Sequence, residues 1–356
     1  ELAELLEIGC HPEAEGQFQA LRAFVLRRFR KPSGNRLRYI VPIYLSNYCV
    51  DTCGYCNFSS RRDSVLRKRL SIEDLEREIA AVMAAGPRVI ELVLGTDPCF
   101  TPAELERYVA KTAEILRGEA GSSVLLCSDY LPRRAYAALR DAGLWGMVQW
   151  DETLEPAAYR RWHSSSPRKQ HFEERMDNHD RAMATGLEAA TGVLFGLADY
   201  RYAVLMQVAT TRHLEGEYGR GAFVFGTARL KPIGGREIHP ATEVGDRAYE
   251  TALMVYQIAD PAAGRWLQTR ETFETNLRNM LDGDAFTLRC GEVRPGGYSN
   301  GPGAPAASRP GGQFAVHELT REEVEERLRA MGFEIAYSWT PAGHTAPRTG
   351  AAVVTA

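Results

Sequence analysis

Short apolar runs and longer amphipathic stretches alternate along most of the chain. Eight of the apolar runs have the length and composition of buried strands. They cover residues 38–45, 88–95, 123–128, 146–150, 189–196, 221–230, 265–269 and 285–288. Between most of them, apolar side chains return every three or four positions, which is the spacing of a helix with one buried face. The pattern therefore predicts repeated strand–helix units.

The clearest predicted helices begin at a capping residue or a proline and end at a glycine. Residues 71–86 begin with Ser71, and Asp74 follows three positions later as a weaker partner for a capping box. Residues 101–118 and 131–143 repeat this arrangement with a threonine or proline start. Strand–helix units of this kind wind a parallel sheet through right-handed crossovers. Their number predicts an α/β fold, a (β/α)8 TIM barrel that is complete or partial.

The two ends of the chain depart from this alternation. Residues 289–315 are rich in Gly, Pro and Ser and have no hydrophobic period, which predicts a long loop of the kind that often covers a binding site. An amphipathic helix follows at 319–333. We therefore expect an N-terminal helical extension at 1–35, the barrel at 36–288, a loop and helix closing the barrel at 289–339, and a tail at 340–356.

Composition and charge exclude several classes of protein. The 356 residues are 44% hydrophobic, which allows a large core, and the net charge of −3 gives no electrostatic argument for nucleic acid or an anionic membrane. No apolar run reaches the roughly 18 residues of a membrane span, and the acidic first residues do not have the pattern of a secretory signal. The seven cysteines are mostly scattered, which argues against a disulfide scaffold and predicts a reducing compartment, the cytoplasm.

One trio of cysteines is closely spaced. Cys49, Cys53 and Cys56 follow the first apolar run in a C-x3-C-x2-C pattern. Three thiolates this close can hold a cubane 4Fe–4S cluster and leave one iron open for a small molecule. The alternatives are a zinc knuckle or reduced thiols on a loop. A closed zinc site needs four protein ligands, and this loop offers no fourth Cys or His.

The motif Cys49-x3-Cys53-x-Tyr55-Cys56, followed by Phe58, resembles the signature of the radical S-adenosylmethionine (SAM) enzymes. The resemblance implies that the open iron binds SAM and that a reductant such as flavodoxin or ferredoxin supplies electrons. It also implies that Tyr55 lies beside the adenine. Phe58 is expected near the adenine, and the alternative is a phenylalanine of the core.

Further stretches resemble the aromatic amino acid lyases of that superfamily, and chiefly 2-iminoacetate synthase, a tyrosine lyase. They are VPIYLSNYC at 41–49, residues 148–163, 192–199, 228–235, 267–272 and 294–299, and QFAVHE at 313–318. The implied reaction splits the Cα–Cβ bond of L-tyrosine to give p-cresol and 2-iminoacetate. The alternatives are fragmentation or rearrangement like that of the related thiopeptide tryptophan lyase, another radical reaction on an amino acid, and a non-enzymatic iron–sulfur scaffold.

The resemblance assigns three residues to the substrate. Arg270 matches the arginine that binds the substrate carboxylate, for which a planar guanidinium is well suited. The alternative is a surface arginine that pairs with Glu271. Tyr44 matches a tyrosine that faces the substrate amino group, or it is a tyrosine of the barrel core. Thr287 stands where the family has a serine that holds the substrate amine.

Three more residues are assigned to SAM. Glu152 and Arg175 match an acidic residue and an arginine that contact polar groups of SAM, although the two could simply pair with each other. In the superfamily a Gly-Glu pair often follows the second strand and receives the amino group of SAM. Here Gly95 is followed by Thr96 and Asp97, so Asp97 is the candidate substitute.

Overall fold

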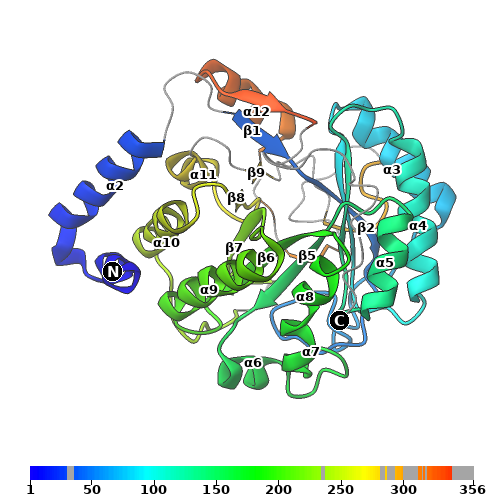
Figure 1. The fold of residues 1–356 in the computed structure, drawn as a ribbon, viewed down its shortest axis with the longest axis horizontal. Coiled ribbons are helices and arrows are strands. Elements are labelled where there is room, and N and C mark those ends of the chain that lie inside the picture. The colour runs from blue at the N-terminus through cyan, green and yellow to red at the C-terminus, as the bar shows by residue number, and fades with distance from the viewer. Residues whose placement is uncertain are drawn as a thin grey trace.

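The computed structural model describes residues 1–29, 36–233, 237–280, 285–286, 293–299, 312–314, 316 and 319–338. Their strands form one parallel sheet of ten strands in the order β10-β1-β9-β8-β7-β6-β5-β4-β3-β2. The sheet curls, and helices cover its outer face (Figure 1). The predicted α/β class and the partial (β/α)8 TIM barrel are confirmed.

All eight predicted apolar runs contain strands, because each can be buried on both faces of a parallel sheet. The strands are β1 Arg36–Tyr39, β2 Val41–Ser46, β3 Val89–Leu94, β4 Ser123–Cys127, β5 Gly146–Glu152, β6 Glu188–Phe195, β7 Val224–Arg229, β8 Gly264–Leu267, β9 Ala285–Phe286 and β10 Glu334–Ala336. The first run forms both β1 and β2. Strand β10 was not predicted, because three residues are too few to show a period.

One segment of the chain links the two sides of the curled sheet. Only Ile40 separates β1 from β2. Strand β1 pairs with β9 and β10, whereas β2 pairs with β3 at the other end of the strand order. Ile40 therefore links the second strand in the order, β1, to the last strand, β2.

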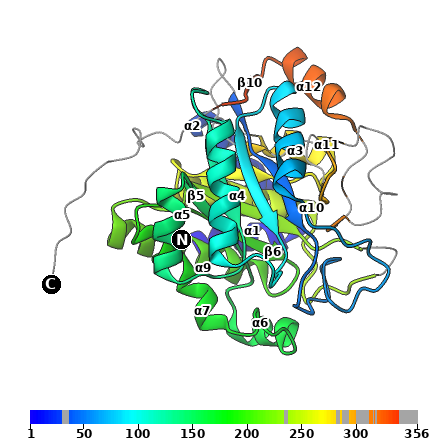
Figure 2. The same cartoon turned by 90° about the vertical axis from the view of Figure 1, so that its right-hand side faces the viewer.

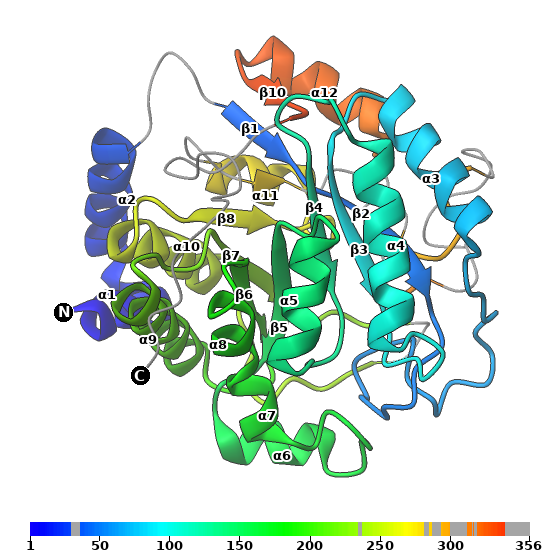
Figure 3. The ribbon, with the colours of Figure 1, turned by 45° about the vertical axis from the view of Figure 1, so that its right-hand side comes forward.

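The helices lie on the outside of the barrel, and Figure 3 shows α3, α4 and α5 side by side over the first strands. They are α1 Leu2–Cys10, α2 Glu15–Phe29, α3 Ile72–Ala84, α4 Pro102–Ile115, α5 Arg133–Asp141, α6 Pro156–His163, α7 Phe172–Met176, α8 Asn178–Met183, α9 Tyr200–Tyr218, α10 Asp246–Ala259, α11 Phe273–Asn279 and α12 Arg321–Ala330. The expected capping box at Ser71 and Asp74 is present in both directions. In the described part of the chain, no helix is long and apolar enough to cross a membrane.

The segments outside the barrel pack on its wall. Leu6 of α1 is buried among side chains of α9 and α10. Helix α12 covers the outer face of β1, where the buried Tyr39 hydroxyl donates to Glu325 Oε1 at 2.9 Å. In Figure 2, α12 and β10 lie at the opposite end of the barrel from the blue loop that follows β2. Most of the predicted loop at 289–315 and the whole predicted tail lie outside the described residues.

A tryptophan forms a floor inside the barrel. Trp150 of β5 fits against Gly192 of β6 and Gly226 of β7, where an added Cβ would come within 2.6 Å and 2.9 Å of the indole. Glycine is therefore required at both positions, because a Cβ atom would collide with the indole. Trp266 of β8 lies beside this floor, with its ring centre 6.3 Å from that of Trp150. Above these aromatic rings, toward the carboxyl ends of the strands, the barrel contains a cavity.

Candidate active site

The cavity brings together most of the residues that the sequence assigns to the site. Its wall includes the three motif cysteines, together with Tyr44, Tyr55, Phe58, Glu152, Arg175 and Arg270. These side chains come from different strands and loops, and they meet because parallel strands place their carboxyl ends at one face of a barrel. One face of the barrel therefore holds both the cysteine loop and the groups expected to bind ligands.

The cysteine loop begins directly after β2. Each thiol has polar neighbours: Cys49 Sγ accepts from the Thr96 N–H at 3.3 Å, and Cys56 Sγ accepts from the Phe58 N–H at 3.4 Å. Cys53 Sγ lies 3.9 Å from Ser166 Oγ. Burial raises the pKa of Cys49 and of Cys53 to about 11. Hydrogen bonds of this kind tune the reduction potential of a cluster held by thiolates.

The three thiols face one cavity and provide the donor set of a cubane cluster. All three cysteines line the same cavity. Within the described residues, no group of three or more His, Cys, Asp and Glu side chains is gathered closely enough to hold one ion. A cubane spaces its thiolates by the width of the cluster, and three of them leave one iron for an outside ligand. The donor set therefore suits a 4Fe–4S cluster with an open corner.

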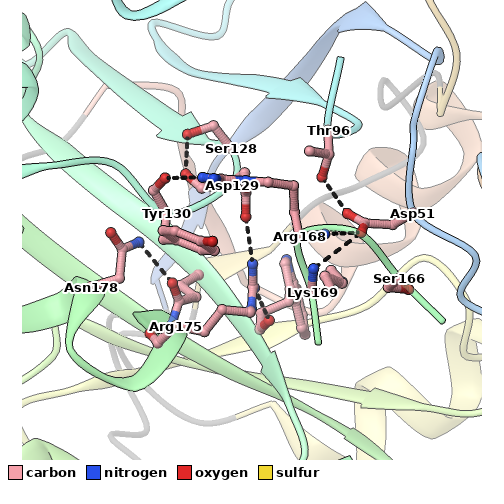
Figure 4. A network of polar contacts seen from close by, with 12 residues as sticks. Asp51, Thr96, Ser128, Asp129, Tyr130, Ser166, Arg168, Lys169, Arg175 and Asn178 are labelled. Atoms are coloured by element: carbon pink, nitrogen blue, oxygen red, sulfur yellow. Dashed lines mark hydrogen bonds and ion pairs between the residues drawn. The ribbon is translucent and has the colours of Figure 1, made fainter. Parts of the chain in front are cut away.

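Asp51 holds the cysteine loop in place (Figure 4). Its Oδ1 accepts hydrogen bonds from the backbone N–H groups of Arg168 and Lys169, both at 3.0 Å. Its Oδ2 accepts from Thr96 Oγ1 at 2.6 Å. Asp51 therefore joins the cysteine loop to the end of β3 and to the segment that carries Lys169. Sequence reasoning missed this residue, because its partners are distant in the chain.

Glu152 stands in a strained position at the end of β5. Among the described non-glycine residues it alone has a positive φ, of 65°, and the register with β6 shifts between Trp150 and Glu152. Such backbone costs about 1–3 kcal/mol and tends to occur at functional sites. The carboxylate pairs with Lys169 Nζ. Burial raises the pKa of Glu152, but Lys169 outweighs burial and leaves that pKa below its ordinary value.

The expected alternative, an ion pair between Glu152 and Arg175, does not form. Arg175 is buried, donates to the Trp150 carbonyl at 2.8 Å and lies 3.4 Å from Asp129 Oδ1. Its Nε has no hydrogen-bond partner among the described residues. Lys169, which the sequence did not identify, is the true partner of Glu152. This part of the cavity wall therefore presents the Glu152 carboxylate beside the cations of Lys169 and Arg175, which suits the zwitterionic end of SAM.

The aromatic residues of the cysteine motif are buried in this wall. The Tyr55 hydroxyl makes a hydrogen bond with His163 Nε2, and its ring meets Trp162 edge-on, with ring centres 6.0 Å apart. Phe58 packs edge-on against Tyr44 at 5.6 Å. Both rings are buried and line the cavity. Their contacts with SAM remain predictions.

Arg270 lies beyond the end of β8 and does not pair with its neighbour Glu271. That carboxylate is occupied by Arg229, whose Nε is 2.9 Å away, and by Lys231. The Arg270 guanidinium instead stacks on the Phe314 ring at 3.8 Å. No hydrogen bond or ion pair joins it to another described residue, and burial lowers its pKa. The alternative of a surface pair with Glu271 is wrong.

Tyr44 lies in the same part of the cavity. Its hydroxyl donates to Gln313 Oε1 at 2.8 Å, so it ties β2 to a described fragment of the C-terminal loop. Arg270 and Glu91 both act electrostatically on this hydroxyl, although burial is the largest cause of its raised pKa. Thr287, the third residue assigned to the substrate, lies outside the described residues.

The structure does not support Asp97 as a ligand of SAM. Its carboxylate accepts from Ser46 Oγ at 2.6 Å, from Arg69 Nη2 at 2.9 Å and from the Cys99 N–H at 3.1 Å. It is absent from the cavity wall, where its neighbour Thr96 appears instead. The prediction fails because both oxygens of Asp97 are already used to hold the loop after β3.

Glu91 is a further cavity residue that the sequence analysis did not single out. It belongs to β3, and its side chain enters the cavity below Tyr44. A signal for it does exist in the sequence. The run at 88–95 is apolar except for its first residue and this one acid, and a charge in the middle of a buried strand is unusual.

Comparisons with known proteins agree with this geometry. Residues 43–201 match the family model of the radical SAM superfamily. The 2-iminoacetate synthase of Escherichia coli (strain K12) is 29% identical over 328 residues, which are 91% of this chain and 83% of that protein. The 3-methylornithine synthase of Methanosarcina barkeri (strain Fusaro / DSM 804) is 24% identical over 166 residues, 47% of this chain and 45% of that protein.

A solved structure has the same architecture. The FeFe-hydrogenase maturase HydG from Carboxydothermus hydrogenoformans superposes with a TM-score of 0.81 at 24% identity, over 95% of this chain and 76% of that chain. At this identity the likeness shows the fold alone. The three-cysteine loop, its position at the carboxyl face and the matched family model agree. Residues 43–201 therefore form a radical SAM domain, the kind of domain that uses a 4Fe–4S cluster and SAM, and the chain is similar to the 2-iminoacetate synthases over most of its length.

Proposed function

We propose that the protein is a carbon–carbon lyase that splits the Cα–Cβ bond of L-tyrosine into p-cresol and 2-iminoacetate. The relation to 2-iminoacetate synthase over most of the chain supports the reaction class. The observation that carries the proposal is Arg270, a cation facing the cavity with no anionic partner among the described residues. A desolvated guanidinium is costly unless it meets an anion, and an amino acid brings a carboxylate of the right shape.

When bound, a reduced cluster and SAM would supply a 5′-deoxyadenosyl radical for abstracting a hydrogen atom. The chain itself binds and orients the reacting groups and excludes water from them. Cys49, Cys53 and Cys56 would hold the cluster, and Glu152 with Arg175 would hold the polar groups of SAM. Positioning of this kind can supply much of the rate of a reaction between bound partners.

Arg270 and Tyr44 would hold the amino acid end of the substrate. The guanidinium would donate two parallel hydrogen bonds to the carboxylate, and the Phe314 ring stacked on its face would hold it in place. The Tyr44 hydroxyl, fixed by Gln313, would face the amino group. Both contacts fix the reacting nitrogen and leave the side chain of the substrate to point down the barrel.

The reaction balances without any oxidant. The atoms of L-tyrosine equal those of p-cresol plus 2-iminoacetate. Cleaving SAM to methionine and 5′-deoxyadenosine takes up two electrons and one proton in all, and the substrate returns none of them. A one-electron donor such as flavodoxin or ferredoxin, acting twice, would satisfy this need. The scattered cysteines suit the reducing cytoplasm where such donors act.

The test is turnover by protein reconstituted without oxygen. With dithionite and SAM, we expect L-tyrosine to raise the yield of 5′-deoxyadenosine. We also expect mass spectrometry to detect p-cresol formed from the added L-tyrosine. The variant Cys56→Ala serves as a control and should form neither product, because a ligand of the cluster is lost. Tyrosine-independent SAM cleavage, with no p-cresol, would contradict the proposal.

A second candidate keeps the same initiation and changes the fate of the substrate. Because the chain also resembles 3-methylornithine synthase over about half its length, a rearrangement of another amino acid is the alternative reaction. A panel containing tryptophan, lysine and tyrosine separates the two by product mass. Rearrangement conserves the mass of the carbon skeleton, whereas lysis yields two fragments.

A further inference from the structure

One carboxyl group of the cavity wall lies deeper in the barrel than Tyr44. Glu91 is in the middle of β3, next to Pro42 on one side and Leu125 on the other. Only 4% of the residue is exposed, and its side chain lines the cavity. The next inward-facing residues along β2 and β3 are Tyr44 and Val93, so Glu91 lies two residues, or roughly 7 Å, further from the mouth.

Glu91 has no polar partner in the described part of the chain, where no hydrogen bond or ion pair reaches it. Burial alone raises its pKa to about 8, with no compensating contact. An unpaired buried carboxyl costs stability, and natural cores seldom keep one without a use. A structural role is hard to find for a group that contacts no other polar side chain. The position instead suggests a ligand that supplies the missing hydrogen bond.

The neighbours of Glu91 describe the shape of that ligand. Glu91 is close enough to Tyr44 and Cys127 to influence both electrostatically, and Arg270 is close enough to influence the same Tyr44 hydroxyl. Tyr44 therefore has both Glu91 and Arg270 in its surroundings. Trp150 and Trp266 line the same cavity with aromatic surface. A ligand that reaches from Arg270 to Glu91 would be anionic at one end, flat and apolar in the middle, and polar at the other end.

We infer that Glu91 is the residue that selects the substrate, by forming a hydrogen bond with the polar group at the far end of its aromatic side chain. The inference rests on the proposed function, since it takes the Arg270 end as the binding place of the amino acid carboxylate. The phenol of tyrosine fits best. A neutral carboxyl and a phenol can each donate and accept one hydrogen bond. Phenylalanine would leave Glu91 unpaired.

The size of the effect follows from this geometry. A site built to hydrogen-bond a substrate hydroxyl discriminates strongly against the analogue without it, because the polar group of the protein is then buried with no partner. We expect wild-type protein to prefer tyrosine over phenylalanine by about 100-fold or more in kcat/KM. The variant Glu91→Leu, with a side chain of similar volume, should reduce that ratio to within about 3-fold. Glu91→Gln should retain part of the preference.

Two measurements make the test independent of turnover. The first is the affinity for tyrosine and for phenylalanine, determined by calorimetry on cluster-loaded protein with SAM. Tyrosine should bind Glu91→Leu at least 10-fold more weakly than wild type, while phenylalanine should not. The second is thermal unfolding without substrate. Removing an unpaired buried carboxyl should raise the unfolding temperature at pH 8 by about 4 °C, so a misfolded variant would be recognised.

The matched control is Glu250→Gln, which changes another buried acid. Glu250 pairs with Arg22 and lies outside the cavity wall. This variant should lose stability and keep the preference for tyrosine.

Unchanged discrimination between tyrosine and phenylalanine in Glu91→Leu overturns the inference, as does a wild-type protein that binds neither amino acid. Glu91-dependent binding of tyrosine without p-cresol supports the inference and refutes the proposed lyase. Glu91-dependent binding of lysine in place of tyrosine overturns the choice of a phenol.

Discussion

Two arginines near the ends of neighbouring strands have opposite surroundings. Arg229, at the end of β7, donates to both oxygens of Glu271 and to Asp246 Oδ1 at 2.9 Å. Arg270, just beyond β8, has an aromatic ring under it and no anion among the described residues. Glu271 is adjacent to Arg270 in the chain and yet serves Arg229. A buried charge with its partners already in place maintains the fold, whereas one without them is available to a ligand.

Two acidic residues, Glu91 on β3 and Asp97 just after it, differ in the same way as the two arginines. Asp97 is fully engaged by Ser46, Arg69 and a backbone N–H, and it has no part in the cavity. Glu91 lies in the cavity and touches no polar group of the described chain. The difference teaches that a candidate residue should be judged by what remains unpaired in the folded protein. Residue type and proximity to the motif are weaker guides.

Replacing Arg270 should have the largest effect on activity. In Arg270→Leu we expect kcat/KM for tyrosine to fall about 1000-fold, or about 4 kcal/mol, because two charged hydrogen bonds to the carboxylate are lost. Initial rates of p-cresol formation measure this loss. The unfolding temperature should stay the same or rise, since no internal partner is left behind. A loss of stability in parallel with activity would remove the distinction between the two arginines.

Replacing Arg229 should damage the fold most. Arg229→Leu leaves Glu271 buried beside only Lys231, and removing one partner of a buried pair costs about 3 kcal/mol of unfolding free energy. Thermal unfolding of the cluster-loaded protein, compared with that of Arg270→Leu, measures the contrast. If both variants unfold at the same temperature, pairing does not separate structural from functional arginines in this barrel.

The pH dependence of stability should distinguish Asp97. Burial alone would raise the pKa of Asp97, but hydrogen bonds from Arg69 and Ser46 outweigh burial and keep that pKa below its ordinary value. The stabilisation is therefore complete above the unfolded-state pKa of about 3.9 and is lost as pH falls through the folded-state pKa. Asp97→Asn should lower the unfolding free energy at pH 7 by about 2 kcal/mol.

The same variant also tests the correction made to the site. Affinity for SAM, measured by calorimetry, should be unchanged in Asp97→Asn, because its carboxylate does not reach the cavity. Below pH 4 the stability difference from wild type should shrink. A 10-fold weaker binding of SAM would restore Asp97 as a ligand and contradict the hydrogen bonding described above.

A smaller effect is expected at Lys169, which keeps Glu152 ionised and aimed into the cavity. Without this ammonium group the pKa of Glu152 should rise, since burial would no longer be opposed by its nearest cation. Lys169→Met should bind SAM about 10-fold more weakly. Lys111→Met, which changes a lysine paired on the outer surface of α4, is the control and should bind SAM normally. Equal affinities in the two variants would exclude Lys169 from the site.

Much of the architecture could be predicted from local pattern. The apolar runs predict the strands because a parallel strand covered on both faces must be apolar along its whole length. The cysteine motif is also local, since one short loop supplies every thiolate. The brief helices α6, α7 and α8 between β5 and β6 were not predicted individually, because segments of five to eight residues hardly display a helical period.

What the sequence determined by itself is therefore the barrel, the position of its first loop and the chemistry of three thiols. Only the tertiary structure decided which charged side chains pair with one another. Glu271 turned out to belong to Arg229, Glu152 to Lys169 and Asp97 to Arg69, across separations of 42, 17 and 28 residues. The reason is physical: a charge is satisfied by whatever lies within a few ångströms of it, and folding brings distant segments that close. For the same reason, only the folded chain reveals that Arg270 and Glu91 were left for something else to bind.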